Sequence, residues 1–279
     1  TGETIMKNTA LSILAITAAF LFASISAFAQ TGAQLILEDK ISGSEGIALC
    51  PDGKLFAVEN GSGKIFQVID DENVSLFSEG HARAAGIACG PAGDIFVADY
   101  GSGTVSVVSA DGKDKKVLAG GFKTPNGIAV SADGTVYMSD STSGIVHEIS
   151  PDGKAERLLE GVSFANGLLI SPDGKMLYIA QTTAGKIVAA PLDGPNRGKK
   201  ITFASKLKMA DGITGTVDGT IYACLFSSGE IAKAVKGADP EIIASGLKTP
   251  ATPVFKDGSL YITSLTGSGL YKVPLPKEE

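Results

Sequence analysis

The chain has 279 residues, of which 44% are hydrophobic and 19% are charged, so it is long and apolar enough to bury a substantial core. Its formal net charge is -6, and it contains no run of Lys and Arg. These features argue against nucleic acid or an anionic membrane surface as a partner, and we expect a stable globular protein.

The first thirty residues differ in character from the rest. After Met6, a single Lys7 precedes an apolar run rich in Ala and Ser, and Ala27-Phe28-Ala29 has the A-x-A form of a signal-peptidase site. We predict a signal peptide over residues 1–29, with a non-native-looking extension before Met6, and export to the periplasm or the medium. A membrane anchor is the alternative, but the short run and its cut site favour cleavage without stable membrane insertion.

Three cysteines, Cys50, Cys89 and Cys224, show no spacing typical of a metal site. One disulfide with one unpaired cysteine would fit an oxidising compartment. We favour the alternative, in which all three are small buried apolar residues.

Residues 30–279 contain a sixfold repeat. Each copy holds an apolar run, a hairpin with Gly, a second apolar run, a glycine turn and two more short alternating runs, and the copies start 39 to 45 residues apart, at Glu45, Ala85, Asn126, Asn166, Asp211 and Pro250. This period, without helical spacing, predicts an all-β, six-bladed β-propeller of four-stranded antiparallel blades in a single domain.

The sixth copy ends after three strands. The alternating stretch AQLILEDK from Ala33 resembles the outer strands of the other copies. We therefore expect an N-terminal strand to complete the last blade, which would close the ring and leave few free sheet edges.

Two positions of the repeat behave differently. Seven residues after each start lies a residue that is always followed by Gly and is Asp in five copies, as in Asp133-Gly134. A feature that recurs in nearly every blade indicates a hairpin turn of the fold. The starting residue instead changes from blade to blade, which indicates a functional position.

In a closed ring, these six starting residues would surround the central channel at one end. Four of them, Glu45, Asn126, Asn166 and Asp211, carry side-chain oxygens. Two carboxylates and two amide carbonyls suit a hard divalent cation, with Ca²⁺ as the first choice and Mg²⁺, Mn²⁺ or Zn²⁺ as alternatives.

The plain alternative is that Asn-Gly and Asp-Gly steps are common in turns. Glu45 is no turn former, however, and Ala85 and Pro250 occupy the same position without a polar side chain. The set of four therefore favours a metal site.

The ordered set of Glu, Asn, Asn and Asp, combined with PDGK hairpins such as Pro51–Lys54, resembles the SMP-30/gluconolactonase/luciferin-regenerating-enzyme-like family of six-bladed propellers. The resemblance implies a divalent ion, usually calcium, and the hydrolysis of a small-molecule lactone or related ester. It implies Glu45, Asn166 and Asp211 as metal ligands. Asn126 would contact the ion's water or the substrate, and Asp211 is also the candidate base.

The sequence departs from family patterns at two places. Animal-type gluconolactonases carry an arginine shortly before the third-blade asparagine, where this chain has Lys123, Thr124 and Pro125. Paraoxonase-like lactonases carry a catalytic histidine at the position of Ala85. A sugar-binding arginine and a histidine mechanism are therefore not supported.

Further residues are weaker candidates. An apolar channel mouth could be formed by Phe122, Phe164, Met209 and Tyr100, although packing between blades explains each of them equally well. His81 is the one candidate proton carrier near the mouth, against the plain interpretation of a solvated loop residue. His147 has no assigned role.

Glu59, Asp99 and Asp140 recur fourteen residues after their blade starts. They could orient the inner ligands, but their recurrence favours a role in holding the blades. The NHL-like runs such as GDIFVADYGSG keep open a different class of protein, a non-catalytic propeller of the NHL or YncE type that binds a ligand or a protein. A strictosidine-synthase-like propeller is a further enzymatic rival, but it has no need of four oxygen donors.

Overall fold

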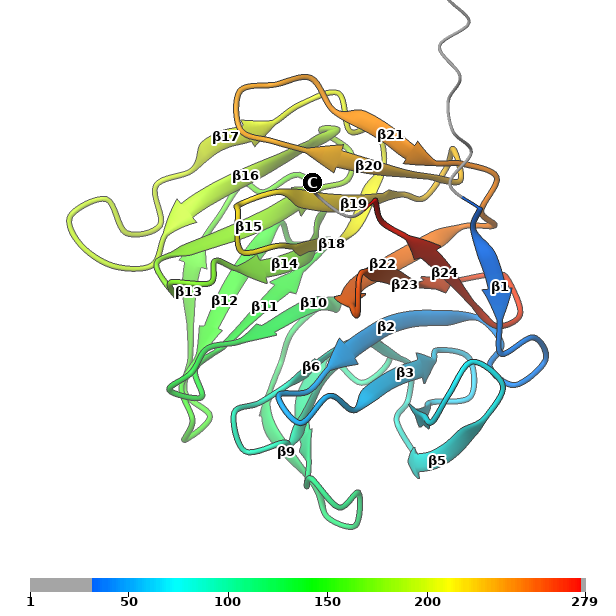
Figure 1. The fold of residues 1–279 in the computed structure, drawn as a ribbon. Coiled ribbons are helices and arrows are strands. Elements are labelled where there is room, and N and C mark those ends of the chain that lie inside the picture. Colours follow the sequence, from blue (N-terminus) through cyan, green and yellow to red (C-terminus); the bar gives the residue numbers. More distant parts are fainter. Residues whose placement is uncertain (1–31, 277–279) are drawn as a thin grey trace, which may run out of the picture.

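The computed structural model describes residues 32–276, and the predicted signal peptide over residues 1–29 lies outside this part. The described chain folds into six four-stranded sheets arranged as the blades of a propeller (Figure 1). Each sheet is antiparallel and connects its strands in sequence order, except for the one shared by the two chain ends. The predicted all-β, six-bladed fold is confirmed. None of the residues from 32 to 276 forms a helix that could cross a bilayer.

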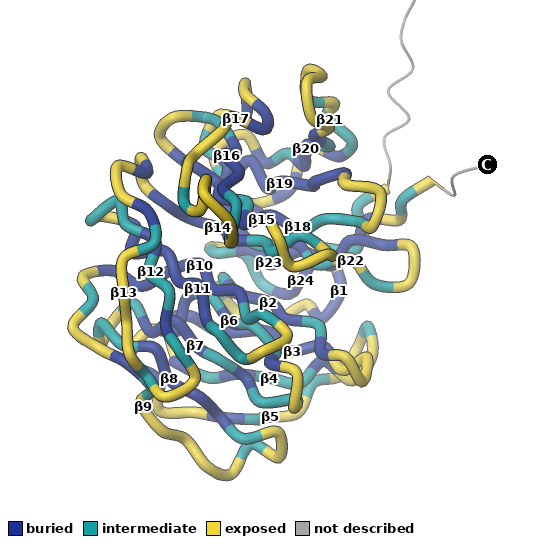
Figure 2. The backbone as a smooth tube through the Cα atoms, turned by 90° about the vertical axis from the view of Figure 1, so that its left-hand side faces the viewer, coloured by how far each residue is buried: buried dark blue, intermediate teal, exposed yellow. Residues whose placement is uncertain are grey.

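The inner two strands of each blade are the most buried (Figure 2). The innermost strands are β2 (Ser44–Leu49), β6 (Ala84–Cys89), β10 (Pro125–Val130), β14 (Ala165–Ile170), β18 (Ala210–Gly215) and β22 (Pro250–Lys256). The second strands are β3 (Leu55–Glu59), β7 (Ile95–Asp99), β11 (Val136–Asp140), β15 (Met176–Gln181), β19 (Ile221–Leu225) and β23 (Ser259–Ser264).

The outer two strands carry most of the exposed surface. The third strands are β4 (Lys64–Val68), β8 (Thr104–Val108), β12 (Ile145–Ile149), β16 (Lys186–Pro191), β20 (Glu230–Ala234) and β24 (Leu270–Pro274). The outermost strands are β5 (Val74–Ser78), β9 (Lys115–Gly120), β13 (Ala155–Leu159), β17 (Ile201–Ala204), β21 (Glu241–Ala244) and β1 (Gln34–Ile36).

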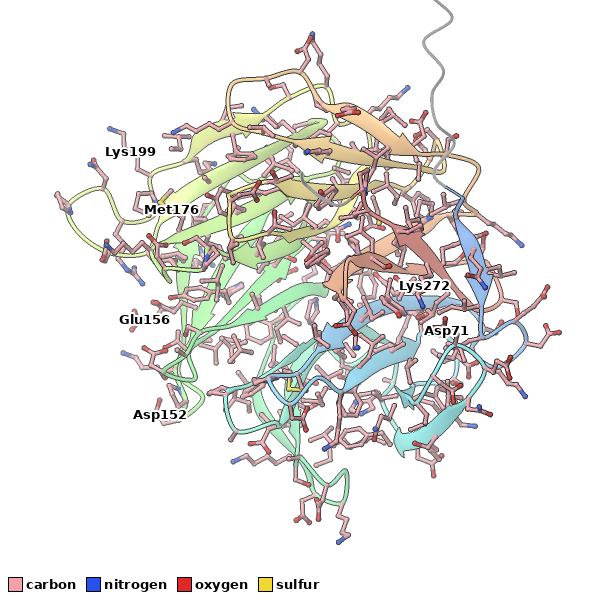
Figure 3. All side chains as sticks on the ribbon, viewed as in Figure 1. Asp71, Asp152, Glu156, Met176, Lys199 and Lys272 are labelled. Atoms are coloured by element: carbon pink, nitrogen blue, oxygen red, sulfur yellow. A yellow bond between two sulfur atoms is a disulfide. The ribbon has the colours of Figure 1, made fainter. Side chains whose placement is uncertain are left out.

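The ring closes as the sequence predicts. Strand β1 pairs with β24 and completes the last blade, although it is shorter than the stretch that suggested it. Lys272 of β24 forms an ion pair with Asp71 of the first blade, with Nζ 2.7 Å from Oδ2, and Figure 3 shows the two side chains near the blue first strand. The contacts between β2 and β22 complete the circle of innermost strands.

The hydrophobic core lies between neighbouring blades. Ile179 and Ile187 of the fourth blade, for example, are fully buried on opposite sides of their sheet, one against the third blade and one against the fifth. Burying a large aliphatic side chain contributes about 1.5–3 kcal/mol, so each seam between blades is a stabilising layer. This arrangement explains why the strands read as apolar runs on both faces.

The hairpins between the first and second strands behave as predicted. Gly134 has φ = 85°, and the Asp133 carboxylate accepts a hydrogen bond from the Thr135 backbone N–H at 3.0 Å. The same pattern recurs at Asp173 and Asp218. These steps are turns of the fold.

The glycines at the start of the innermost strands have another cause, because their φ values are not positive. A Cβ on Gly127 would clash with the backbone carbonyl of Asn166 in the next blade, and the same holds for the equivalent glycines around the ring: Gly46, Gly86, Gly167 and Gly212. These strands therefore approach one another too closely for any side chain. The Asn126-Gly127 step lies at an irregularity of the β10–β11 pairing.

This geometry corrects the sixth ring position. Pro250 pairs with Ser264 as Ala165 pairs with Gln181, so Ala251 is the counterpart of Asn166. The carbonyl that a Cβ on Gly212 would meet also belongs to Ala251. The predicted ring residue of the sixth blade, Pro250, is therefore wrong by one position, and Ala251 in its place also carries no side-chain oxygen.

The expectation of three unpaired cysteines is wrong. Cys50 and Cys89 form a disulfide between the ends of β2 and β6, with their Cα atoms 5.1 Å apart, and only Cys224 is free and buried among the described residues. The two half-cystines are 39 residues apart, close to one repeat, because they occupy nearly equivalent places in neighbouring blades. The spacing of the two cysteines therefore nearly equals the length of one repeat, and it indicates equivalent positions in adjacent blades.

Candidate active site

Three of the four predicted oxygen donors line one small cavity on the channel axis. Glu45, Asn126 and Asn166 contribute to its wall, and its volume is about 30 Å³. Asp211 adjoins it, since its carboxyl group lies close enough to the Asn166 amide and to Glu45 for both side chains to act on its pKa. The structure thus brings together the four side chains that the sequence analysis singled out, from four different blades.

Apolar side chains close the channel directly beneath these donors. Ile87, Ile128, Leu168 and Ile213 line the small cavity and also a cavity of about 270 Å³ at the opposite end of the channel. Each of them follows its ring residue by two positions, so the alternation of the strand returns it to the channel. The four oxygen donors therefore lie above a layer of apolar side chains, which we call the apolar floor, and the channel is not a continuous pore.

The two carboxyl groups sit in an environment that disfavours their charge. Burial raises the pKa of Glu45 to about 7, partly offset by the Arg83 guanidinium. Burial first, and the Glu45 charge second, raise the pKa of Asp211 well above its usual range. Without a cation, two such neighbours do not both ionise at neutral pH, whereas a dication would stabilise both anions.

The donor set and the space agree with a single small ion. Two carboxylates balance the charge of a divalent cation, and two amides add neutral oxygen donors of the kind that Ca²⁺ accepts. A cavity of about 30 Å³ is large enough for one ion or one water. Within residues 32–276, no group of three or more His, Cys, Asp or Glu side chains surrounds a metal position, so the amide oxygens would be indispensable.

Asn60 is a site residue that the sequence analysis missed. Its Nδ2 donates to Glu45 Oε2 at 2.7 Å and to the Ala84 carbonyl at 2.7 Å, and its Oδ1 accepts from Arg83 Nε at 3.1 Å. All hydrogen-bonding roles of the amide agree with one orientation, which fixes the Glu45 carboxylate. A comparison of equivalent positions could have revealed Asn60, because Ser141 and Thr182 also directly follow the second strands of their blades. Their hydroxyl groups likewise donate to a backbone carbonyl of the next blade.

A rim of six residues surrounds the ring, each two positions before its ring residue. In every blade, the carbonyl of this residue accepts the backbone N–H that follows the second strand. The rim residues are Gly43, Arg83, Thr124, Phe164, Met209 and Thr249.

Two of the four residues that were predicted to form an apolar channel mouth belong to the rim. Phe164 and Met209 occupy rim positions, with positive φ values of 48° and 58°. Tyr100 lies under the Arg83 guanidinium, which is 5.0 Å from the ring centroid. Phe122 lies elsewhere, because it packs against His147 of β12 at a centroid distance of 4.9 Å.

His81 is not a rim residue. It is 5% exposed, its backbone N–H donates to the Gly63 carbonyl, and its Nε2 lies 3.4 Å from Ser78 Oγ. Burial, with the Lys115 charge as a smaller cause, lowers the pKa of His81 to about 4. The equivalent residues in other blades include Phe122 and Val162, so His81 fills a packing position and is poorly placed to carry protons.

The recurrent acidic residues of the second strands hold the blades, as their recurrence favoured. The Asp99 carboxylate accepts the backbone N–H groups of Ala82 and Arg83 at 2.8 and 2.9 Å. Asp140 does the same for Lys123 and Thr124. Glu59 accepts the Ser42 N–H. These bonds shape the rim, and none of the three carboxylates lines the small cavity.

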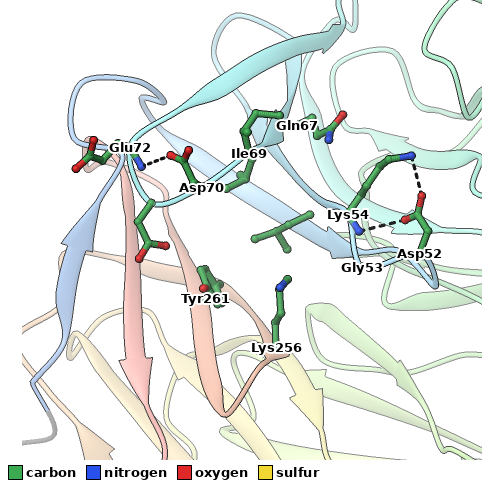
Figure 4. Close-up of a pocket in the computed structure, with 12 residues that line it drawn as sticks. Asp52, Gly53, Lys54, Gln67, Ile69, Asp70, Glu72, Lys256 and Tyr261 are labelled. Atoms are coloured by element: carbon green, nitrogen blue, oxygen red, sulfur yellow. Dashed lines mark hydrogen bonds and ion pairs between the residues drawn. The ribbon is translucent and has the colours of Figure 1, made fainter.

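A larger cavity of about 770 Å³ lies at the opposite face, between the first and sixth blades (Figure 4). Its acidic groups serve local structure: Asp52 pairs with Lys54, and Asp70 accepts hydrogen bonds from Asn73. No set of side chains converges there as it does on the axis. We therefore place the candidate active site at the smaller cavity, on the grounds of chemistry rather than size.

Part of the chain matches a known protein family. Residues 142–266 match the family model described as the SMP-30/gluconolactonase/LRE-like region. A 67-residue stretch is 34% identical to the strictosidine synthase-like protein 10 of Arabidopsis thaliana, but it spans only 24% of this chain and 18% of that protein.

Solved structures share the whole fold. A gluconolactonase from Xanthomonas campestris superposes with a TM-score of 0.77 at 22% identity, covering 90% of this chain and 93% of the other. A putative gluconolactonase gives 0.75 at 18% identity, with 88% and 92% covered. A virginiamycin B lyase from Staphylococcus aureus gives 0.65 at 15% identity, with 85% and 82% covered. The chain is thus a six-bladed propeller that carries the SMP-30/gluconolactonase/LRE-like region over residues 142–266.

Proposed function

We propose that the protein is a divalent-metal-dependent hydrolase of a lactone or related ester. The observation that carries the proposal is the convergence of Glu45, Asn126, Asn166 and Asp211 on one point of the axis, above an apolar floor. Buried carboxyl groups with raised pKa values at a channel mouth are typical of functional sites. The family match and the gluconolactonase structures support the same class of reaction.

Glu45, Asn166 and Asp211 would hold the ion, and Ca²⁺ suits this mixture of carboxylate and amide oxygens best. When bound, a divalent ion supplies a Lewis acid for the carbonyl oxygen and lowers the pKa of water. Asn60 keeps Glu45 in place through its hydrogen bond. Asn126 faces the same cavity and can donate its amide N–H to a substrate oxygen.

Asp211 is the residue best placed to take a proton from water, although a carboxylate bound to a dication is a weak base. Its burial and its contact with Asn166 fix its position beside the cavity. The reacting part of the substrate would lie above the small cavity, at the rim, because about 30 Å³ holds no more than an ion or a water.

A lyase reaction is less well supported. The virginiamycin B lyase with a matching fold is known as a catalytically inactive variant in which a histidine is replaced by alanine. In this chain His81 is buried in packing, and His147 stacks against Phe122. Neither lines the small cavity.

Export fits the covalent structure. The Cys50–Cys89 disulfide is a feature of proteins in oxidising compartments, which supports the predicted signal peptide and a periplasmic or secreted location.

The test is a calcium titration combined with an activity screen of the mature protein. We expect Ca²⁺ to raise the melting temperature, a panel of lactones and esters to be hydrolysed, and a chelator to abolish turnover reversibly. A non-catalytic propeller of the NHL or YncE type would hydrolyse none of these lactones and esters in the presence of Ca²⁺, Mg²⁺, Mn²⁺ or Zn²⁺. That result would reject the proposal.

A further inference from the structure

The rim of the site is asymmetric in charge and polarity. Of its six residues, Arg83 alone is charged, whereas Phe164 and Met209 lie on the blades across the channel. Exposed lysines directly precede three other rim residues, at Lys123, Lys208 and Lys248. The twelve residues at these two positions include four cations and no acidic residue, on a protein of net charge -6.

Arg83 is held in a defined orientation. Its Nε donates to Asn60 Oδ1 at 3.1 Å, and the plane of Tyr100 supports its guanidinium group at 5.0 Å. Nε is its only side-chain nitrogen in a hydrogen bond within residues 32–276, and Arg83 forms no ion pair there. The two terminal nitrogens are therefore available, in the planar arrangement that matches a carboxylate or phosphate.

The same contacts tie Arg83 to the reaction centre. Asn60 joins it to Glu45, so the guanidinium lies one residue away from the cavity. Its charge also acts on Glu45. A group bound by Arg83 would thus lie beside the ring on the side of the first two blades, and the rest of a substrate would extend toward Phe164 and Met209.

Resting on the function proposed above, we infer that Arg83 is a specificity-determining residue that anchors an anionic group of the substrate. The substrate class is an amphipathic lactone or ester, with a carboxylate or similar anion at one end and an aliphatic or aromatic part at the other. This arginine is the rim residue of the second blade, whereas the rim residue of the third blade, Thr124, is uncharged and only the exposed Lys123 precedes it.

The test compares two lactones with the same aliphatic side chain, ending either in a carboxylate or in the neutral carboxamide. We expect the wild type to prefer the carboxylate in kcat/KM. Arg83→Gln should reduce kcat/KM for the carboxylate roughly 10- to 100-fold more than it reduces kcat/KM for the carboxamide, because only the carboxylate loses charge-assisted hydrogen bonds. Arg83→Lys should fall between them, because it keeps the charge but loses the fork.

Arg157→Gln is the matched control. It removes the same charge from an exposed strand of the third blade, where Arg157 pairs with Glu160. It should change neither substrate, which separates anchoring from a change in net charge. Equal effects of Arg83→Gln on both lactones, or equal effects of the two variants, would overturn the inference.

Failure of the proposed function gives a different pattern. If the wild type hydrolyses neither lactone, binding of the same pair is measured by calorimetry, with wild type and Arg83→Gln side by side. Preferential binding of the carboxylate that is lost in Arg83→Gln upholds the anchor without the hydrolase. No preference, or one that Arg83→Gln retains, overturns the anchor as well.

Discussion

The dipeptide Asp-Gly occurs at the start of strand β18, as Asp211-Gly212, and again in the hairpin that follows this strand, as Asp218-Gly219. The two copies have different roles. The Asp211 carboxyl is buried beside Glu45 and Asn166 and has a raised pKa. The Asp218 carboxylate is exposed, and hydrogen bonds, first from Thr216, lower its pKa. The same residue type therefore has a raised pKa at one position of the repeat and a lowered pKa at the other, and the position in the repeat decides which.

The two glycines differ in the same way. Gly219 has φ = 88°, which a turn requires and which costs other residues strain. Gly212 has no such φ, but a Cβ there would clash with the backbone of Ala251 and Thr252 in the next blade. One glycine serves the shape of the chain, and the other serves the close approach of neighbouring blades.

The largest effect on activity should come from substituting Asp211, at the end of β18 that faces the candidate active site. Asp211→Asn removes one of two anionic donors, and we expect kcat/KM for a lactone substrate to fall roughly 100-fold or more. The fold should persist, because the amide keeps the size of the side chain and, like the protonated carboxyl that the raised pKa favours without an ion, places no charge in the interior. The measurement is kcat/KM together with the melting temperature in a chelator.

Asp218→Asn is the control for this variant. Its carboxylate lies at the hairpin end of the same strand, so activity should be unchanged and stability should fall by no more than about 1 kcal/mol. Equal losses of activity in the two variants would contradict the division between the two ends.

The disulfide at the hairpin end should contribute most to stability. It closes a loop of 39 residues between the first two blades, and such a crosslink contributes about 2–4 kcal/mol. Cys50→Ala/Cys89→Ala should lower the free energy of unfolding by this amount and leave the metal affinity unchanged. A reductant should destabilise the wild type but not the double variant.

The two glycines give a matched pair of smaller changes. Gly212→Ala forces a side chain against the backbone of the sixth blade, and we expect a loss of about 3 kcal/mol. Gly219→Ala has free space and pays only for its backbone conformation, about 1 kcal/mol. Urea denaturation measures both, and a larger loss at Gly219 would show that blade contact is not the reason for the inner glycine.

His81 should affect stability only in acid. Because its folded pKa of about 4 lies below its unfolded value, the neutral form stabilises the fold above about pH 6.5. This contribution is lost as the pH falls from about 6.5 to 4, by about 1–3 kcal/mol.

His81→Phe copies the third blade, where Phe122 fills the same position, and should flatten the change over that pH range. Lys115 and Asp99 act on the same ring and remain in the variant. A slope that stays the same in His81→Phe would assign the acid sensitivity to other groups.

The blade architecture and the four oxygen donors could be predicted because they depend on a period and on a position that varies within it. Glu45, Asn126, Asn166 and Asp211 stand out only after the six copies are aligned. The alignment slipped by one residue at Pro250 because the sixth inner strand lacks the glycine that marks the other five, with Thr252 in its place.

Contacts between different blades could not be predicted. Asn60 lies on the same blade as Glu45, but its bonds with the Ala84 carbonyl and with Arg83 cross to the second blade, and no spacing within one copy predicts them. Cys50 and Cys89 meet for the same reason, because neighbouring blades place equivalent strand ends together. The sequence alone does not reveal the packing role of His81, because this role becomes visible only when His81 is compared with Phe122 and Val162 at the equivalent positions.

The central claim is that Glu45, Asn166 and Asp211 hold one divalent ion at the axis. Calorimetric titration of chelator-stripped protein with Ca²⁺ tests it most directly, using the wild type, Asp211→Asn and Asp218→Asn. The account predicts one ion per chain for the wild type and Asp218→Asn, with binding lost or greatly weakened in Asp211→Asn. Absence of binding in the wild type, or an affinity that Asp211→Asn leaves unchanged, would contradict it.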